Sequence, residues 1–221
     1  MSVVIATITD KQVILCADKQ VTNMQTGEVK SDGATKIEKW SSSVGVSCCG
    51  NGALCEVILN AVRRYVAEEG GVDNFDLEDI ADFFAQAYYA AVEEYSNMPS
   101  NIISKFIVAG KLSSGKVGVI ELLLKDGIAD AESIVAKELP VTLFHEPEDM
   151  SGEECNLLFQ KAIAYTKKNN KYHQDPSESI HRRTVRYISE RSKFVGHKSD
   201  YLVIRPQDTK EQQYDSSRNA L

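Results

Sequence analysis

The order of strands and helices along the chain is the feature that most restricts its fold. Runs of apolar and β-branched residues predict a hairpin at residues 3–8 and 13–17, followed by strands at 35–40 and 44–49. A pair of helices, a second group of at least three strands, another pair of helices and a last strand follow. Strands that arrive in hairpin-linked groups between helix pairs predict an α+β fold of antiparallel sheets covered by helices.

The later elements are predicted from periodicity and from capping signals. Apolar residues at helical spacing indicate a first helix after Gly52, with Leu54, Val57, Ile58, Ala61, Val62 and Tyr65 on its buried side. The remaining helices are expected at 76–95, at 151–168 behind a capping box, and at 177–192. The remaining strands are expected at 102–108, 117–124, 129–135 and 200–205. We expect one domain over residues 1–206 and a polar tail over 207–221.

Composition excludes several classes of protein. The 221 residues contain no apolar run of membrane-spanning length and no signal-peptide pattern at the start. A net charge of −7 argues against nucleic acid or an anionic membrane as the main partner. The odd number of cysteines favours buried thiols in a reducing cytoplasm over disulfides or metal ligands; they are Cys16, Cys48, Cys49, Cys55 and Cys155. The sequence implies no cofactor and no metal.

The second residue, Ser2, is a candidate nucleophile. A small residue at this position permits removal of Met1, which would leave the α-amine of Ser2 free beside its own hydroxyl. Such an amine can act as the base for the neighbouring oxygen. The simpler interpretation, an ordinary residue near the start with no role, remains open.

Three segments resemble the proteasome β-subunit family, in particular its branch of bacterial proteasome-like peptidases. VILCADKQVT at 13–22 resembles the family's strand-end signature, and ATKIEKW at 34–40 resembles its Lys-Ile strand. VSCCGNGALCEVIL at 46–59 resembles its glycine-containing turn from strand to helix. The resemblance extends in detail over residues 1–66, and later segments match in order only.

The resemblance implies the four-layer αββα sandwich of N-terminal-nucleophile (Ntn) hydrolases and hydrolysis of amide bonds in a peptide or protein substrate. It implies that Ser2 is both nucleophile and, through its amine, base. Asp18 takes the position of the family's acidic partner, Lys36 that of its lysine and Gly50 that of its oxyanion donor, although the loop between Asp18 and Lys36 is longer than usual. The resemblance also implies homo-oligomeric rings or stacked rings and, less directly, an ATPase partner.

Substrate contacts are implied in the same way. Thr22 matches the residue whose backbone pairs with an extended substrate. Positions that line the family's primary pocket match Val21, Ala34, Cys48, Gly52 and Glu56. The small residues at Cys48 and Gly52 would leave room, and Glu56 would favour a basic side chain.

The chain also departs from the family. The segment AKELPVTLFHEPEDM at 136–150 lacks the usual Gly-Ser-Gly turn. Ser192 stands near the expected aspartate of an Asp-x-x-Ser-Gly segment, and Val195-Gly196 replace its Ser-Gly. Ser199 and Asp200 are candidate substitutes.

Several alternatives stay open. Asp18 and Lys36 can be read as a structural ion pair, and Gly50 as a requirement of a sharp turn. The basic stretch from His181 to Lys198 is interpreted as a solvated helix face or as a contact with an acidic neighbouring subunit. The rival functions are a small-molecule amidase or acyl-transfer enzyme of the same fold, and a non-catalytic ring subunit.

Overall fold

The computed structural model describes residues 2–23, 26–94, 102–169 and 176–206. The strands are β1 (Val4–Ile8), β2 (Val13–Asp18), β3 (Val21–Thr22), β4 (Val29–Ser31), β5 (Ile37–Lys39), β6 (Gly45–Gly50), β7 (Ile103–Lys111), β8 (Val117–Lys125), β9 (Ile128–Val135), β10 (Val141–His145) and β11 (Ser199–Ile204). One sheet has the order β10-β1-β2-β11, a second has the order β5-β6-β7-β8-β9, and β3 pairs with β4 alone. Every described pairing is antiparallel, as the sequence predicts.

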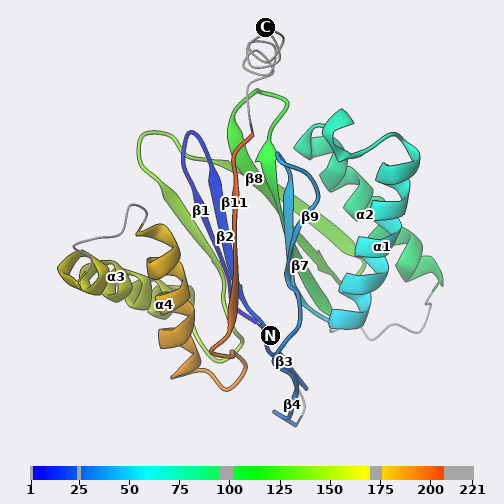
Figure 1. Cartoon of the computed structure of the whole chain (residues 1–221). Coiled ribbons are helices and arrows are strands. Elements are labelled where there is room, and N and C mark those ends of the chain that lie inside the picture. Colours follow the sequence, from blue (N-terminus) through cyan, green and yellow to red (C-terminus); the bar gives the residue numbers. More distant parts are fainter. Residues whose placement is uncertain (1, 24–25, 95–101, 170–175, 207–221) are drawn as a thin grey trace, which may run out of the picture.

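Helices lie outside both large sheets (Figure 1). They are α1 (Gly52–Glu68), α2 (Leu77–Glu94), α3 (Gly152–Asn169) and α4 (Ser177–Ser189), with a single 3₁₀ turn, η1 (Val72–Asn74). The α1–α2 pair packs on the five-stranded sheet, and the α3–α4 pair packs on the four-stranded sheet. The chain is therefore a mixed α/β protein built from antiparallel sheets and helices.

Apolar side chains form three separate cores. The first joins α1 and α2 to the five-stranded sheet through residues such as Ile58, Phe84 and Phe106. The second lies between the sheets and includes Leu15 and Ile107. The third lies between the four-stranded sheet and the α3–α4 pair; it contains Val3, Ile5, Cys16, Cys155, Leu158, Val185, Ile188 and Val195. Burial of each fully buried Leu, Ile or Phe side chain contributes about 1.5–3 kcal/mol to the free energy of unfolding.

Strand β1 is buried along both of its faces. Val4, Ala6 and Ile8 point into the core between the sheets, while Ile5 points into the core under α3 and α4. This explains why residues 3–8 are almost uniformly apolar instead of strictly alternating. The residue that precedes this strand by one position is Val3, so Ser2 is held where the buried strand begins.

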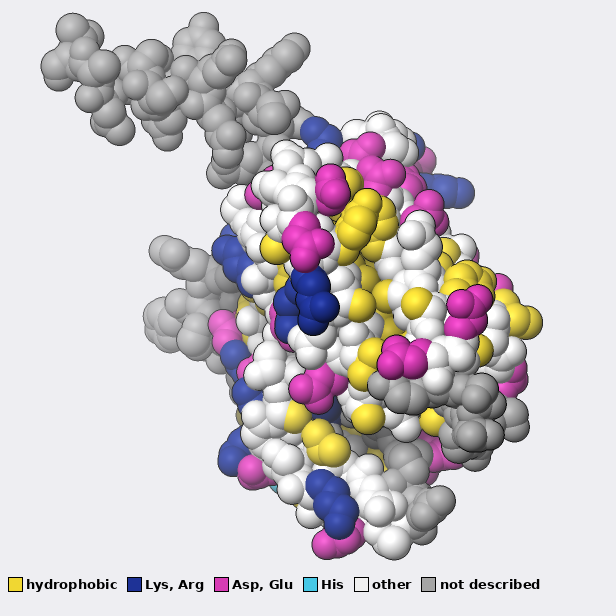
Figure 2. All heavy atoms as spheres, turned by 90° about the vertical axis from the view of Figure 1, so that its right-hand side faces the viewer, with side chains coloured by type: hydrophobic (Ala, Val, Ile, Leu, Met, Phe, Trp, Pro, Cys, Tyr) yellow, Lys and Arg dark blue, Asp and Glu magenta, His cyan; other side chains and the backbone are white. Residues whose placement is uncertain are grey.

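The structure differs from the sequence prediction in three strands and one helix face. β3 with β4, and β10, were not predicted; the first pair is short and polar, and β10 is recognisable mainly through its pairing with β1. In α1, three of the residues at the predicted helical spacing are buried, but Val57, Ala61 and Tyr65 are exposed. Figure 2 shows hydrophobic side chains among charged ones on the face that carries α1 and α2.

The capping box at the start of α3 is present. The backbone N–H of Glu154 donates to Ser151 Oγ at 3.3 Å, and the N–H of Ser151 donates to a Glu154 carboxylate oxygen at 2.9 Å. Helix α4 ends at Ser189, three residues before the predicted end. The predicted tail at 207–221 and the predicted end of the second helix at Tyr95 lie outside the described residues.

The basic stretch of α4 is only partly solvated. His181 is 2% exposed and lies against β1, where Thr7 Oγ1 is 2.9 Å from its Nε2. Arg182 Nε donates to Glu178 at 2.7 Å, and the Arg183 guanidinium lies 4.0 Å from the centre of the Tyr165 ring. These contacts give His181, Arg182 and Arg183 partners within the chain, and the neighbouring-subunit interpretation stays a prediction.

Candidate active site

Ser2, Asp18 and Lys36 meet where β1 begins and β2 ends. The Lys36 ammonium donates to Ser2 Oγ at 2.5 Å and to Asp18 Oδ1 at 3.0 Å. Ser2 and Lys36 are 8% and 7% exposed, and Asp18 is 0% exposed. Three residues spread over 34 positions of sequence are thus joined through one nitrogen.

The Asp18 carboxylate is fully supported by hydrogen bonds. Its Oδ1 accepts from the N–H of Val3 at 3.1 Å as well as from Lys36. Its Oδ2 accepts from the N–H of Gln20 at 2.9 Å and from the N–H of Gly196 at 3.2 Å. Because a buried polar group is costly unless it is hydrogen-bonded, these contacts satisfy both carboxylate oxygens and fix the orientation of the Asp18 side chain.

Lys36 is placed as a fixed cation. Burial lowers the pKa of its ammonium, and the charge of Asp18 works in the opposite direction. Its third proton is directed to the carbonyl oxygen of Gln20. Since an ammonium has three donors and all three are used, Lys36 donates to Ser2 Oγ and has no lone pair with which to accept the serine proton.

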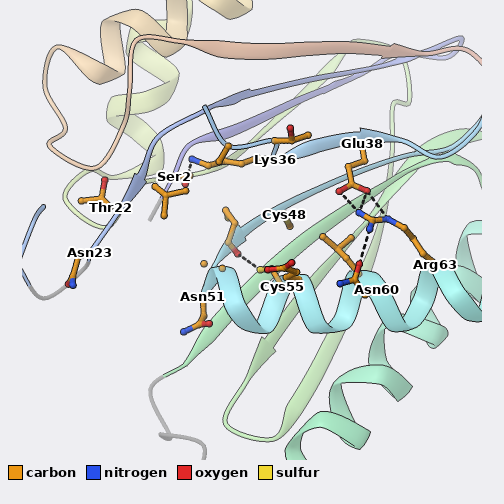
Figure 3. Close-up of a pocket in the computed structure, with 18 residues that line it drawn as sticks. Ser2, Thr22, Asn23, Lys36, Glu38, Cys48, Asn51, Cys55, Asn60 and Arg63 are labelled. Atoms are coloured by element: carbon orange, nitrogen blue, oxygen red, sulfur yellow. Dashed lines mark hydrogen bonds and ion pairs between the residues drawn. The ribbon is translucent and has the colours of Figure 1, made fainter. Parts of the chain in front are cut away.

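A pocket of about 750 Å³ opens beside this cluster (Figure 3). Ser2, Lys36 and Gly50 line it together with every predicted substrate contact: Val21, Thr22, Ala34, Cys48, Gly52 and Glu56. Asp18 is absent from the lining because it lies behind Lys36. Figure 3 shows Thr22 and Asn23 on one side of Ser2, and Asn51, the N-cap of α1, with Cys55 of α1 on the other.

Gly50 has a steric reason to be glycine. Its φ is +113°, and a Cβ there would lie 2.2 Å from the carbonyl oxygen of Ile103 in β7. The turn alone therefore accounts for the residue, and its role as an oxyanion donor stays a prediction. At Gly52 a Cβ would meet nothing within 4 Å, so this glycine does leave open space in the pocket.

The far end of the pocket contains a charged pair that the sequence analysis did not identify. Arg63 of α1 donates through Nε and Nη2 to the Glu38 carboxylate of β5, and through Nη1 to Asn60 Oδ1 at 2.9 Å. Trp40 Nε1 also donates to Glu38 at 3.0 Å. Glu56, the predicted acidic determinant, is exposed. The only available sequence signal was the i, i+3 spacing of Asn60 and Arg63 on the helix.

The pocket cysteine Cys48 is a poor nucleophile. A hydrogen bond with the Cys55 thiol and burial both raise the pKa of Cys48. A thiol that resists ionisation reacts slowly with electrophiles. Its contribution to the pocket is therefore its small size.

Residues 192–200, which replace the expected Asp-x-x-Ser-Gly segment, form the following contacts. Ser192 Oγ donates to Asp149 Oδ1 at 2.6 Å, and Asp200 forms an ion pair with Lys19 at 2.9 Å. Gly196 provides the N–H that supports Asp18, and Ser199 pairs with Asp18 across the β2–β11 ladder. Asp149 was not among the residues predicted from the sequence.

The described residues contain no group of three or more His, Cys, Asp or Glu side chains arranged to hold a metal ion. No helix among them is long and apolar enough to cross a membrane.

The fold and the cluster together define a mixed α/β chain with a buried serine–lysine–aspartate arrangement at the edge of a pocket. No family model and no curated protein sequence matches the chain. Among solved structures, it is similar to the eukaryotic HslV from Trypanosoma brucei, with a TM-score of 0.51 and 15% sequence identity over 92% of this chain and 99% of that chain. At this identity the likeness shows a shared fold.

Proposed function

We propose that this chain, once Met1 is removed, hydrolyses amide bonds in peptides or proteins as a proteasome-like Ntn hydrolase. The observation that carries the proposal is the 2.5 Å contact between Lys36 Nζ and Ser2 Oγ, with the buried Asp18 behind it and a pocket beside it. The fold likeness to HslV, a proteasome-like Ntn hydrolase, supports the same class of enzyme. Assignment to the bacterial branch stays a prediction.

The proposal includes the four-layer αββα sandwich. Two facing sheets with a helix pair outside each, and three successive cores, support that architecture. It also places Ser2 at the open end of the space between the sheets, where an extended substrate can approach.

The chemistry follows from the donors and acceptors around Ser2. Lys36 is occupied as a donor, so the proton of Ser2 Oγ must go to another base. A free α-amine, with an unperturbed pKa of about 7.7–8.0, accepts that proton near neutral pH and later passes it to the leaving amine. The fixed charge of Lys36 stabilises the alkoxide-like oxygen as it attacks the carbonyl carbon.

The oxyanion of the tetrahedral intermediate needs its own donor. We assign this role to the backbone N–H of Gly50, which lies on the pocket wall. A donor of this kind is worth about 2.7–4 kcal/mol of transition-state stabilisation.

The pocket suits a peptide with one side chain inserted. Thr22 belongs to β3, an extended segment whose backbone can pair with an extended substrate, and it lines the pocket close to Ser2. Glu56 in the same lining favours a basic side chain at the cleaved residue. Assembly into homo-oligomeric rings or stacked rings, a cytoplasmic location and an ATPase partner belong to this proposal as expectations carried by the family resemblance.

The first test is the intact mass of the protein purified from its native host. We expect a mass that lacks Met1, and we expect an electrophile that captures a hydroxyl with its neighbouring amine to label Ser2. Ser2→Ala should abolish labelling and peptide cleavage, whereas Ser2→Thr should retain both. Ser31→Ala, at an exposed position of β4, is the matched control and should behave as wild type.

The outcomes separate the rival functions. Retention of Met1 in native protein, or undiminished cleavage by Ser2→Ala, would refute the proposal. Labelling of Ser2 with turnover of small amides but of no peptide would favour the small-molecule amidase. A chain that lacks Met1 yet is inert to both substrates and electrophiles would favour a non-catalytic ring subunit.

A further inference from the structure

A second polar cluster lies in the core between the two large sheets. Cys49 of β6, His145 of β10 and Glu121 of β8 are brought together there from three strands. The Cys49 sulfur lies 3.5 Å from His145 Nδ1, and Glu121 Oε1 lies 2.7 Å from His145 Nε2. His145 is 1% exposed and Cys49 is 5% exposed. The proposed reaction at Ser2 uses none of these three groups.

The two neighbours of His145 favour its charged form. Burial alone would lower the pKa of the imidazole, but Cys49 and Glu121 raise it to about 9. The hydrogen bond from His145 in turn lowers the pKa of the Glu121 carboxyl. A thiol held against an imidazolium is stabilised as the thiolate, which is the reactive form of cysteine.

Three of the other four thiols, those of Cys16, Cys48 and Cys155, differ from Cys49. Burial raises the pKa of Cys16 to about 12 and that of Cys155 to about 11. Both have 0% exposure, and neither lines the pocket of Ser2. Cys48 does line that pocket, but its pKa is raised by Cys55 and by burial. Cys49 combines a basic partner with a place in the lining of the pocket.

Stability alone gives no reason for this cluster. A buried ion pair contributes little compared with well-packed apolar side chains of similar volume. Apolar side chains pack around the cluster, with Ile107, Ala109 and Val119 among them. The arrangement of a thiol, an imidazole and an orienting carboxylate is instead the one that activates sulfur as a nucleophile.

We propose that Cys49 is a peroxide-sensitive thiol, activated by His145 and held in place by Glu121. The thiolate attacks one oxygen of hydrogen peroxide, the S–O bond forms and the O–O bond breaks. Cys49 is oxidised by two electrons to the sulfenic acid, and the peroxide is reduced. His145 gives its proton to the departing hydroxide, which leaves as water. Because Cys49 is only 5% exposed, its oxidant must be small, and hydrogen peroxide meets this condition.

The experiment measures the loss of each thiol at pH 7. The full-length protein is treated with hydrogen peroxide, quenched with catalase at intervals and denatured, and the remaining thiols are alkylated with N-ethylmaleimide and quantified by peptide mass spectrometry. Because alkylation follows denaturation, access of the reagent does not limit the readout. We expect Cys49 to be lost first. Cys48, which is adjacent in sequence and lines the same pocket, is the internal control.

Two variants test the roles of His145 and Glu121. A thiol with an ordinary pKa near 8.5 is about 3% ionised at pH 7, so a partner that stabilises the thiolate can raise the reactive fraction by at most about thirtyfold. The higher nucleophilicity of a more basic thiol offsets part of this, and His145→Gln should slow oxidation of Cys49 about tenfold. Glu121→Gln, at a partly exposed side chain, should slow it by a smaller factor and guards against failure of His145→Gln to fold.

Two results would overturn the proposal. One is oxidation of Cys48, Cys16 or Cys155 at the same rate as Cys49 in the folded wild-type protein. The other is a rate for Cys49 in folded His145→Gln and Glu121→Gln that stays within twofold of wild type.

Discussion

Replacement of Lys36 by methionine should destabilise the protein far more than loss of an ordinary lysine. At the 3.0 Å separation of Lys36 Nζ and Asp18 Oδ1, the Coulomb attraction is about 5.5 kcal/mol at an effective dielectric constant of about 20. Methionine fills the space of the lysine stem but leaves Asp18, at 0% exposure, with its charge unpaired. Breaking a buried pair in this way costs about 3–5 kcal/mol.

Urea denaturation of the single and double variants measures this effect. Asp18→Asn should also be destabilising, because its amide would face the N–H groups of Gln20 and Gly196. The double variant Asp18→Asn/Lys36→Met should lose less than the sum of the single losses, by roughly 2–3 kcal/mol. The control is Lys198→Met, which removes the exposed ion pair with Asp32 and should leave the free energy of unfolding close to wild type.

The reasoning is refuted if Lys36→Met unfolds within about 1 kcal/mol of wild type, or if the two single losses are additive. Either result would mean that Asp18 and Lys36 do not form a buried ionised pair. The charge that is proposed to act on Ser2 would then be missing as well.

Three further predictions concern the pocket and the core. Gly50→Ala should lower the free energy of unfolding by about 3 kcal/mol or more in urea denaturation, because of its φ of +113° and the 2.2 Å approach of a backbone oxygen; an unchanged midpoint would contradict this. Arg63→Gln removes the cation paired with the Glu38 carboxylate and should raise kcat/KM for peptides cleaved after Lys or Arg about tenfold relative to neutral residues. An unchanged ratio would show that this pair does not face the substrate. The pKa of His145 is raised to about 9 in the folded protein, so its contribution to the free energy of unfolding is complete below the unfolded pKa of about 6.5 and is lost as pH rises through about 9. The difference in the free energy of unfolding between wild type and Glu121→Gln should therefore shrink between about pH 6 and 10. A constant difference would contradict this.

Local patterns were sufficient to predict most of the framework. β1 and β2 are dense in β-branched and apolar residues because both of their faces are buried, and the sequence shows this directly. The same holds for α2, where Ile80, Phe84 and Tyr88 recur at helical spacing and are all buried. These elements depend on residues that are close together in the chain, which is what periodicity can detect.

Long-range pairing accounts for what the sequence did not predict. β10 is a strand because β1 lies beside it, and its own five residues carry a weak signal. In α1 the predicted residues Leu54, Ile58 and Val62 are buried, whereas Tyr65 is 44% exposed and packs at the edge of the core against Phe83, with 4.6 Å between ring centres. The contact between Cys49 and His145 joins residues 96 positions apart. No spacing rule reaches that distance.

The candidate site was predicted in its residue types but not in its geometry. The resemblance predicted Ser2, Asp18 and Lys36 from the sequence. Only the fold shows that the Lys36 ammonium contacts both Ser2 Oγ and Asp18 Oδ1. The Glu38–Arg63 pair depends on how β5 and α1 face each other across the pocket. That arrangement is a property of the packed sheet and helix and not of either segment alone.

The burial of β1 up to Val3 has a practical consequence for anyone who produces this protein. Ser2 lines the pocket, so under the proposed function a peptide joined to its amino side would interfere with substrate binding there. An affinity tag belongs at the opposite terminus. A leader designed to be cleaved immediately before Ser2 would keep the proposed enzyme inactive until the leader is removed.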